Sequence, residues 1–222
     1  MAGPGAVTAD GCPVEVYRRL PALGEPELVH AWSPPGARVL DLGAGVGRVA
    51  DPLVELGHEV LAVDNSPEML RHVRRAGAHV GEIAGLRLGS RFDVVLLASH
   101  LVNTPDDGLR AELLATAARH LAPGGRLLGQ WHPPEWFDGL RAGEVAAGVM
   151  GEVRSRFTVR GLADGLLTAT VEYSIGDSSW LQPFRARRLT GRDLDVALSR
   201  AGLRRMELLP GAADWFGAVP LP

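Results

Sequence analysis

Two aspartates and two histidines stand at positions where the predicted elements bring polar side chains together. Asp41 and Asp64 each end a short apolar run, and His100 and His132 each follow another such run further along the chain. Runs of this kind are typical of buried parallel strands, whose carboxyl ends share one edge of a sheet and face the ligand there. Carboxylates at this edge bind cations or sugar hydroxyls, and an imidazole accepts a proton near neutral pH.

A glycine-rich turn connects the first apolar run to an amphipathic helix. Gly43, Gly45 and Gly47 follow Asp41 at alternate positions. Glycine lets the backbone turn tightly and approach a ligand, and a helix N-terminus presents free N–H groups to it. Dinucleotide sites use the spacing G-x-G-x-x-G/A, whereas here Arg48 occupies the place of the third small residue. Because Asp41 would also repel a pyrophosphate, an NAD-dependent oxidoreductase is the disfavoured alternative.

This pattern of apolar strand, aspartate and glycine turn resembles motif I of the class I S-adenosylmethionine-dependent methyltransferases, in their bacterial small-molecule type. The resemblance implies an α/β, Rossmann-like fold with a seven-stranded, mostly parallel sheet and helices on both faces. It implies S-adenosylmethionine as the cofactor and S-adenosylhomocysteine as the product. Gly43, Ala44 and Gly45 are then expected to pack against the methionine part of the cofactor, with Asp41 near its ammonium group.

The same resemblance assigns the remaining cofactor contacts. Asp64 ends the second strand, where an acid accepts both ribose hydroxyls. Asn65, Glu82 and Ile83 are the expected adenine contacts, and Met69 is a further expected cofactor contact. Glu82 departs from the family pattern, which has Asp at this place.

The exits of the next two strands carry the candidate catalytic groups. Ser99, His100 and Asn103 follow the apolar run 94–98 and match the motif IV region of the family. We expect Ser99 to contact the cofactor and Asn103 to contact the substrate. His100 and His132 are alternative bases, although His100 is equally interpreted as a cofactor contact or as a cap of the following turn.

Aromatic residues supply the candidate walls of a substrate pocket. Trp131 and Trp136 flank His132, and aromatic walls suit an apolar or cationic substrate. Tyr17 comes from the N-terminal helices that cap the cofactor in the resembling family. Packing within the domain is the alternative role for each of these rings.

From about residue 152 the hydrophobic pattern changes to a period of two. Apolar and polar residues alternate over 167–175, with turn signals on both sides, which predicts about three antiparallel strands inserted after the fifth core strand. Such inserts often form a lid or floor for the substrate in small-molecule methyltransferases. Tyr173 and Arg185 are the insert residues that we expect to bind substrate.

The whole chain is expected to form one domain, because 222 residues suit one large α/β unit. Its predicted parts are the N-terminal cap helices (1–36), the cofactor-binding core (37–135), the inserted antiparallel strands (152–188), and the last helix with the closing strands (189–222). The closing strands are predicted over 204–209 and 215–219, with their turn at Gly211.

Composition excludes several classes of protein. The net charge is −3, without the basic patch of a nucleic-acid-binding protein, and the single cysteine, Cys12, precludes an internal disulfide. The sequence has no 18-residue apolar run and no signal-peptide pattern, so we expect no membrane association and a cytoplasmic location. It also lacks a residue cluster with metal-ligand spacing, so no metal is expected.

The predicted function is methyl transfer to the nitrogen or oxygen of a small molecule in specialised metabolism. Two alternatives use the same cofactor: non-methyl chemistry such as cyclisation of its aminobutyrate arm, and a protein that binds the cofactor without catalysis. The predicted partner is the small-molecule substrate. A homodimer is a further possibility, because the edge of the inserted sheet could pair with a second copy of the chain.

Overall fold

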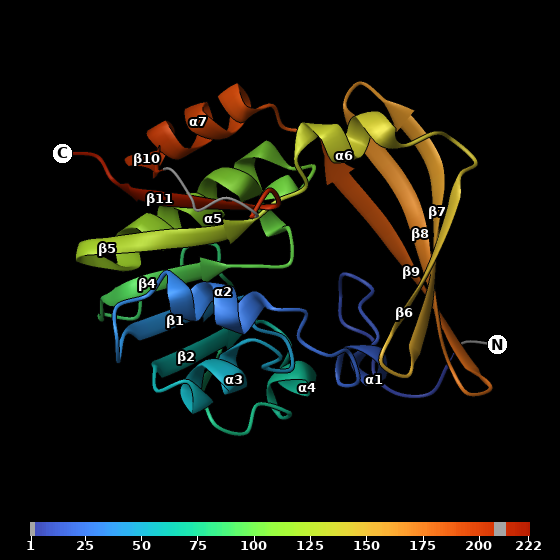
Figure 1. The fold of residues 1–222 in the computed structure, drawn as a ribbon, viewed down its shortest axis with the longest axis horizontal. Helices are drawn as coiled ribbons and strands as arrows, with labels where there is room; N and C mark the ends of the chain where they lie inside the picture. Colours follow the sequence, from blue (N-terminus) through green and yellow to red (C-terminus); the bar gives the residue numbers. More distant parts are fainter. Residues whose placement is uncertain (1–2, 207–211) are drawn as a thin grey trace.

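The structure is a computed structural model that describes residues 3–206 and 212–222, and these residues form two separate β-sheets (Figure 1). The larger sheet has seven strands in the order β10-β11-β5-β4-β1-β2-β3. Its strands are β1 (Arg38–Leu42), β2 (Glu59–Asp64), β3 (Gly77–Val80), β4 (Phe92–Leu97), β5 (Leu121–Gln130), β10 (Leu203–Met206) and β11 (Trp215–Pro220). Strands β1 to β5 pair in parallel, and β10 and β11 pair antiparallel. The predicted seven-stranded, mostly parallel sheet is confirmed.

Helices cover both faces of the larger sheet. One face carries α2 (Glu25–Ala31), α3 (Ala50–Glu55) and α4 (Pro67–Leu70), and the other carries α5 (Asp107–His120) and α7 (Gly191–Arg200). The short helices α1 (Val14–Tyr17) and α6 (Pro134–Gly139) pack against the smaller sheet instead. Successive strand residues point to opposite faces, so Leu40 of β1 packs in the cluster that holds α5 and α7, whereas Val39 packs with α2, α3 and α4. Apolar residues on both faces explain why these strands read as continuous hydrophobic runs.

Two helices begin at the capping residues that the sequence indicates. Asp106 accepts hydrogen bonds from the N–H groups of Gly108 and Leu109 at the start of α5. Thr190 and Asp193 form a reciprocal capping box at the start of α7. The sequence predicts helices over 106–121 and from Thr190 to Gly202, and both helices lie close to these bounds. Their first turns have local side-chain partners for the free N–H groups.

The amphipathic pattern of residues 67–76 predicts a helix there, but in the structure α4 is shorter and ends at Leu70. The cause is Asp51, whose carboxylate accepts hydrogen bonds from the backbone N–H groups of Arg74, Arg75 and Ala76. These bonds replace the helical ones and turn the chain toward β3. The competing acceptor lies 23 residues away from Arg74, so the helical pattern alone does not indicate it.

The smaller sheet has four antiparallel strands rather than about three, in the order β6-β7-β8-β9. They are β6 (Val145–Met150), β7 (Val153–Ala163), β8 (Leu166–Ile175) and β9 (Ser178–Arg187). The first of them, β6, escaped prediction because its residues are apolar or glycine on both faces and show no period of two. Figure 1 shows this sheet beside the larger one, with the arrowheads of β4 and β5 directed toward it.

Near the end of the chain, β10 and β11 pair antiparallel, as expected for the closing strands. The predicted extension of the first closing strand to Leu209 and the predicted turn at Gly211 lie outside the described residues. Among residues 3–206 and 212–222, no helix has the length and apolar character that a membrane span requires.

Candidate functional site

The glycine turn after β1 is held against the end of β2. The N–H groups of Gly43 and Ala44 both donate to the carbonyl oxygen of Val63, at 2.8 and 3.0 Å. Gly43 has a φ of +78°, and a Cβ atom there would come within 2.7 Å of the Leu101 side chain. A positive φ and a close neighbour together require glycine at this place, as the sequence pattern indicates.

Asp41 is the penultimate residue of β1, and its buried carboxylate lies beside this turn. The residue is 2% exposed, and its carboxylate accepts no hydrogen bond from the described residues. Burial raises the pKa of Asp41 from 3.8 to about 7, and the nearby Arg48 guanidinium only partly opposes this effect. A buried carboxylate without a donor is costly, so its place at the strand end suits a cationic ligand group.

Asp64 lies at the end of the neighbouring strand, and the backbone orients it. One carboxylate oxygen accepts the N–H of Gly45 at 2.8 Å, and the other accepts the N–H of Ser66 at 2.9 Å. Each oxygen keeps a further lone pair. Asp64 therefore joins the glycine turn to β2 and can still accept two hydroxyl groups.

The residues expected around adenine lie after β2 and β3. Asn65 donates its side-chain N–H to the Glu82 carboxylate, at 3.2 and 3.3 Å to the two oxygens. Ile83 is half-buried against the main core, and its carbonyl accepts the hydroxyl of Thr116 at 2.8 Å. Met69 is 3% exposed, below the end of β2. The structure thus brings Asn65 and Glu82 together, although they are separated by β3.

The chain leaves β4 through a strained turn. Ser99 and His100 have φ values of 55° and 59°, a left-handed conformation that costs free energy in residues other than glycine. The Ser99 N–H donates to the side-chain oxygen of Gln130 at 3.1 Å, which holds the turn in place, while the Ser99 side chain is exposed. Residues kept in this conformation are found at functional sites more often than elsewhere.

Three rings form a stacked column beyond this turn. His100 stacks on His132 with ring centres 3.7 Å apart and an angle of 7°, and His132 stacks on Trp136 at 3.9 Å and 14°. Phe184 of β9 meets the His132 ring edge-on at 6.0 Å. The column therefore leads from the end of β4 to the inner face of the inserted sheet.

Both histidines of the column are held in the neutral form. Burial lowers the pKa of His100 to about 4 and the pKa of His132 to about 3. At His100 the carboxylates of Asp214 and Glu25 only partly offset the effect of burial on the pKa. At His132 repulsion from a proton on His100 lowers the pKa further. A neutral imidazole accepts a hydrogen bond, but a group with so low a pKa retains a transferred proton poorly.

Asn103 joins three parts of the chain through its side chain. Its oxygen accepts the N–H of His132 at 2.7 Å, and its nitrogen donates to the carbonyl oxygens of Arg187 at 2.9 Å and of His132 at 3.3 Å. The residue is 2% exposed. Both ends of the amide are thus engaged by the backbone, so Asn103 positions His132 and the end of β9.

The predicted substrate residues do not all meet at one place. The Tyr17 hydroxyl lies within hydrogen-bond distance of the Gln182 side chain, and Tyr173 packs beside it in the cluster between α1 and the inserted sheet. Burial raises the pKa of Tyr173 to about 12 and that of Tyr17 well above its usual value. Trp131 lies 7% exposed in the main core. Arg185 is exposed, on the face opposite Phe184, because strand neighbours alternate.

A connection that the sequence did not suggest involves Arg48. Its guanidinium forms an ion pair with Glu25 at 2.6 Å and donates to the carbonyl oxygen of Pro21. Glu25 is 8% exposed, so this pair ties the start of α2 to the glycine turn. Gln130 is a second residue that the sequence analysis does not assign to the site. Its side chain contacts Ser99 and Asp214, and a polar residue at the end of a strand is the signal that indicates it.

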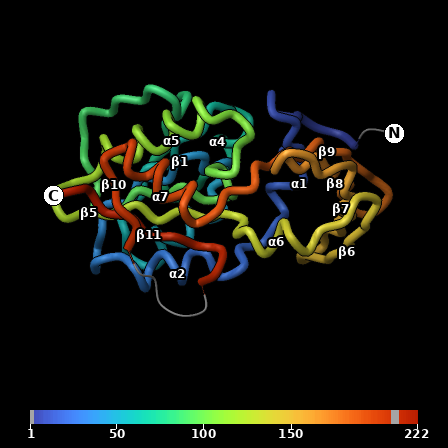
Figure 2. Tube along the Cα trace, turned by 90° about the horizontal axis from the view of Figure 1, so that it is seen from above, coloured from blue at the N-terminus to red at the C-terminus, as the bar shows by residue number. Residues whose placement is uncertain are grey.

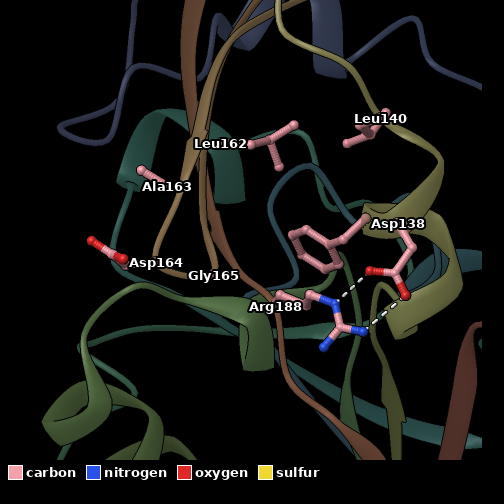
Figure 3. Close-up of a pocket in the computed structure, with 8 residues that line it drawn as sticks. Asp138, Leu140, Leu162, Ala163, Asp164, Gly165 and Arg188 are labelled. Atoms are coloured by element: carbon pink, nitrogen blue, oxygen red, sulfur yellow. Dashed lines mark hydrogen bonds and ion pairs between the residues drawn. The ribbon is translucent and has the colours of Figure 1, made fainter.

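A pocket of about 260 Å³ lies elsewhere, beside α6 and the β7–β8 turn (Figure 3). Its lining residues are Phe137, Asp138, Leu140, Leu162, Ala163, Asp164, Gly165 and Arg188. Asp138 and Arg188 form two hydrogen bonds of 2.8 Å and so neutralise each other. None of the predicted site residues lines this pocket, so we assign the chemistry to the strand ends instead.

The described part of the chain holds no group of three or more His, Cys, Asp or Glu side chains arranged for a metal ion. The ionisable groups that the structure places at the strand ends include Asp41, Asp64 and the two neutral histidines of the column. Their arrangement suits an organic ligand with one cationic group and two hydroxyls.

Comparison with known proteins agrees with this geometry. Residues 39–125 match the family model described as a methyltransferase domain. An uncharacterised methyltransferase of Mycobacterium tuberculosis is 36% identical over 162 residues, which cover 67% of this chain and 63% of that protein. The chain spans only 40% to 63% of the length of the first curated relatives that it matches.

Two solved structures have similar folds. The CcbJ methyltransferase from Streptomyces caelestis has a TM-score of 0.76 at 24% identity, with 91% of each chain covered. CalS10 from Micromonospora echinaspora, an amino pentose methyltransferase solved with S-adenosylmethionine bound, has a TM-score of 0.69 at 24% identity, with 87% of each chain covered. These likenesses extend over both sheets and confirm the class I methyltransferase fold.

Proposed function

The chain has the class I methyltransferase fold with a methyltransferase domain over residues 39–125, and from this premise we propose that it methylates the nitrogen of a small amine. The observation that carries the cofactor assignment, on which the proposal rests, is the buried Asp41, whose carboxylate has no hydrogen-bond donor among the described residues. S-Adenosylmethionine supplies both an ammonium group that fits Asp41 and a transferable methyl group on a sulfonium.

The strand ends provide a place for each part of this cofactor. Asp41 binds the ammonium group, and Gly43, Ala44 and Gly45 lie along the methionine part. Asp64, held by the N–H groups of Gly45 and Ser66, accepts the two ribose hydroxyls. We assign the remaining contacts, around adenine and the sulfonium end, to Asn65, Met69, Glu82, Ile83 and Ser99.

The histidine column favours an amine over a hydroxyl as the acceptor. A hydroxyl must lose its proton during methyl transfer, which requires a group that takes up this proton. The low pKa values of His100 and His132, about 4 and about 3, make both weak bases. A neutral amine already presents its lone pair, so it needs only to be positioned in line with the methyl group.

In this proposal His100 and His132 accept a hydrogen bond from the amine and orient it. Trp136 extends the column toward the acceptor, and Tyr17 of α1 and Tyr173 of β8 border the acceptor region. Asn103 positions His132. Trp131 lies in the core and Arg185 lies on the face of the sheet opposite Phe184, so the proposal gives neither residue a substrate contact.

The deciding experiment is calorimetric titration with S-adenosylhomocysteine, with NAD as the comparison ligand. We expect binding of the first alone, and we expect Asp64→Ala to lose on the order of 1.5–3 kcal/mol of affinity. Asp177→Ala, an exposed aspartate in the turn between β8 and β9, is the matched control and should bind normally. Binding of NAD alone, or unchanged affinity in Asp64→Ala, would refute the site.

Turnover with S-adenosylmethionine and a panel of amines and phenols then tests the reaction. We expect S-adenosylhomocysteine to form only when an amine is added. Release of methylthioadenosine without an acceptor would instead indicate cyclisation of the aminobutyrate arm. Binding of the cofactor without turnover on any acceptor would favour the non-catalytic alternative.

The proposed partners are a small amine in specialised metabolism and a second copy of the chain. A cytoplasmic location and the absence of nucleic-acid and membrane partners stay predictions from composition. Cell fractionation of the native protein tests the location directly.

A further inference from the structure

The edge strand β6 exposes apolar side chains on both faces of the inserted sheet. Val145 and Val149 are 49% and 70% exposed, and the three residues between them are exposed as well. Among the described strands β6 pairs only with β7, which leaves its other backbone edge free (Figure 2). A free edge with apolar side chains is a template for pairing with another strand.

Other edge strands of the molecule carry features that prevent such pairing. In β9 these are Pro183, Arg185 and Arg187, and in β10 they are Arg204 and Arg205. The edge strand β3 has only four residues. Because β6 has six residues without a proline or a charge, its edge is the least protected of the four.

The sequence around β6 reads nearly the same in both directions from Ala147. On the two sides of this residue stand, in turn, Ala146 and Gly148, Val145 and Val149, and at the ends Gly143 and Gly151. In a two-fold antiparallel pair, each residue opposes the one at the same distance on the other side of the axis. An axis at Ala147 therefore places valine opposite valine and a small residue opposite a small residue.

The charges near β6 are compatible with this pairing. Arg154 and Arg156 of β7 stand opposite Val149 and Ala147, so they lie one strand away from the free edge. The nearest acidic residue in sequence, Glu144, would oppose Met150 of the other copy. Like charges that face each other directly destabilise a sheet, and this pairing of β6 with β6 creates no such pair.

We propose that the chain forms a two-fold symmetric dimer in which β6 of one copy pairs antiparallel with β6 of the other. The two inserted sheets then form one continuous sheet, and each valine of one copy packs beside a valine of the other. The pairing uses the free edge of both copies, so assembly stops at two. A single strand pair buries less area than a standard interface, so the dimer should dissociate in the micromolar range. The proposal does not depend on methyl transfer.

Sedimentation velocity over a series of protein concentrations tests the dimer. The wild-type chain should shift from monomer to dimer across the micromolar range. Ala147→Arg sets two guanidinium groups opposite each other at the axis, so its dissociation constant should rise about tenfold or more. Val80→Arg, on the β3 edge where Val80 is 55% exposed, is the matched control and should dimerise like wild type. A monomer at all concentrations, or a dimer unaffected by Ala147→Arg, overturns the proposal.

Cysteine cross-linking tests the register. Under mild oxidation Ala147→Cys should form a covalent dimer, because the two introduced thiols are opposite each other. Val149→Cys should not, because its two thiols would lie about 13 Å apart along the strands. The wild-type chain, with Cys12 alone, gives the background. A covalent dimer in Val149→Cys but not in Ala147→Cys would refute the axis at Ala147.

Discussion

At the scale of single residues, Asp41 lowers the stability of the ligand-free protein and provides the contact that we propose for the ammonium group of the cofactor. The residue is 2% exposed and its carboxylate lacks a hydrogen-bond donor among the described residues, so its charge destabilises the ligand-free protein. Asp64, one strand away, differs because two backbone N–H groups already satisfy it. A bound cation should therefore stabilise the carboxylate of Asp41 more than that of Asp64.

Replacing Asp41 by Asn should stabilise the ligand-free protein above pH 7. Burial raises the pKa of Asp41 to about 7 in the folded protein, from 3.8. A carboxyl group whose pKa is higher in the folded state makes stability fall as the pH rises between these two values. The wild type should show this loss between about pH 4 and pH 7, and Asp41→Asn should not. Thermal unfolding across this pH range measures the difference.

The same variant should bind S-adenosylhomocysteine about tenfold or more weakly, because the ammonium group loses its counter-charge. For the wild type, affinity should rise with pH through 7, as the carboxyl group becomes ionised. Asp177→Asn controls for the loss of one acid at an exposed site. Equal melting temperatures and equal affinities for wild type and Asp41→Asn would show that Asp41 is not the cofactor contact.

At the scale of elements, the short 3-10 helix η1 (Leu101–Asn103) connects the larger sheet to the inserted one. Asn103 at its end bonds the backbone of His132 after β5 and of Arg187 at the end of β9. These bonds fix the distance between elements that are separated by more than 80 residues. The position of the stacked histidines depends on this junction.

Asn103→Ala should therefore lower the free energy of unfolding by about 2–4 kcal/mol, because buried backbone groups lose their partner. Urea unfolding measures this loss. Asn65→Ala is the matched control, since Asn65 is exposed and should change stability by less than about 0.5 kcal/mol. Cofactor affinity should show the opposite ranking: Asn65→Ala is expected to weaken it, and Asn103→Ala is not. If Asn103→Ala were as stable as the wild type, Asn103 would not stabilise the connection between the two sheets.

At the scale of the whole molecule, we propose that the cofactor binds on the larger sheet and the acceptor binds between the two sheets. The assigned cofactor residues lie at the ends of β1, β2, β3 and β4, whereas the column of rings points to the inner face of the inserted sheet. A ligand that contacts only the larger sheet should stabilise that sheet selectively.

Hydrogen exchange measures this difference. S-Adenosylhomocysteine should slow amide exchange over 43–47 and 64–66, because binding stabilises the turn that Gly45 and Asp64 close. Exchange in β6 to β9 should change little. NAD should slow neither region. Protection confined to the inserted sheet would place the cofactor site elsewhere.

Much of the fold could be predicted because its signals are local. Apolar runs, the glycine turn and the caps Asp106 and Thr190 each act within a few residues, so strands and helix starts agree with the structure. The end of α4 could not be predicted in this way, because the competing acceptor, Asp51, comes from a distant part of the chain. The strand β6 lacked the polar face that a period of two requires.

The sequence by itself determined the order of the elements and the placement of Asp41 and Asp64 at strand ends, because both follow from residue types and their spacing. Only the tertiary structure decided which side chains meet. His100 stacks on His132, Trp131 lies in the core, and Arg185 lies on the face opposite Phe184. These contacts depend on strand register and on the packing of distant segments, which no local pattern specifies.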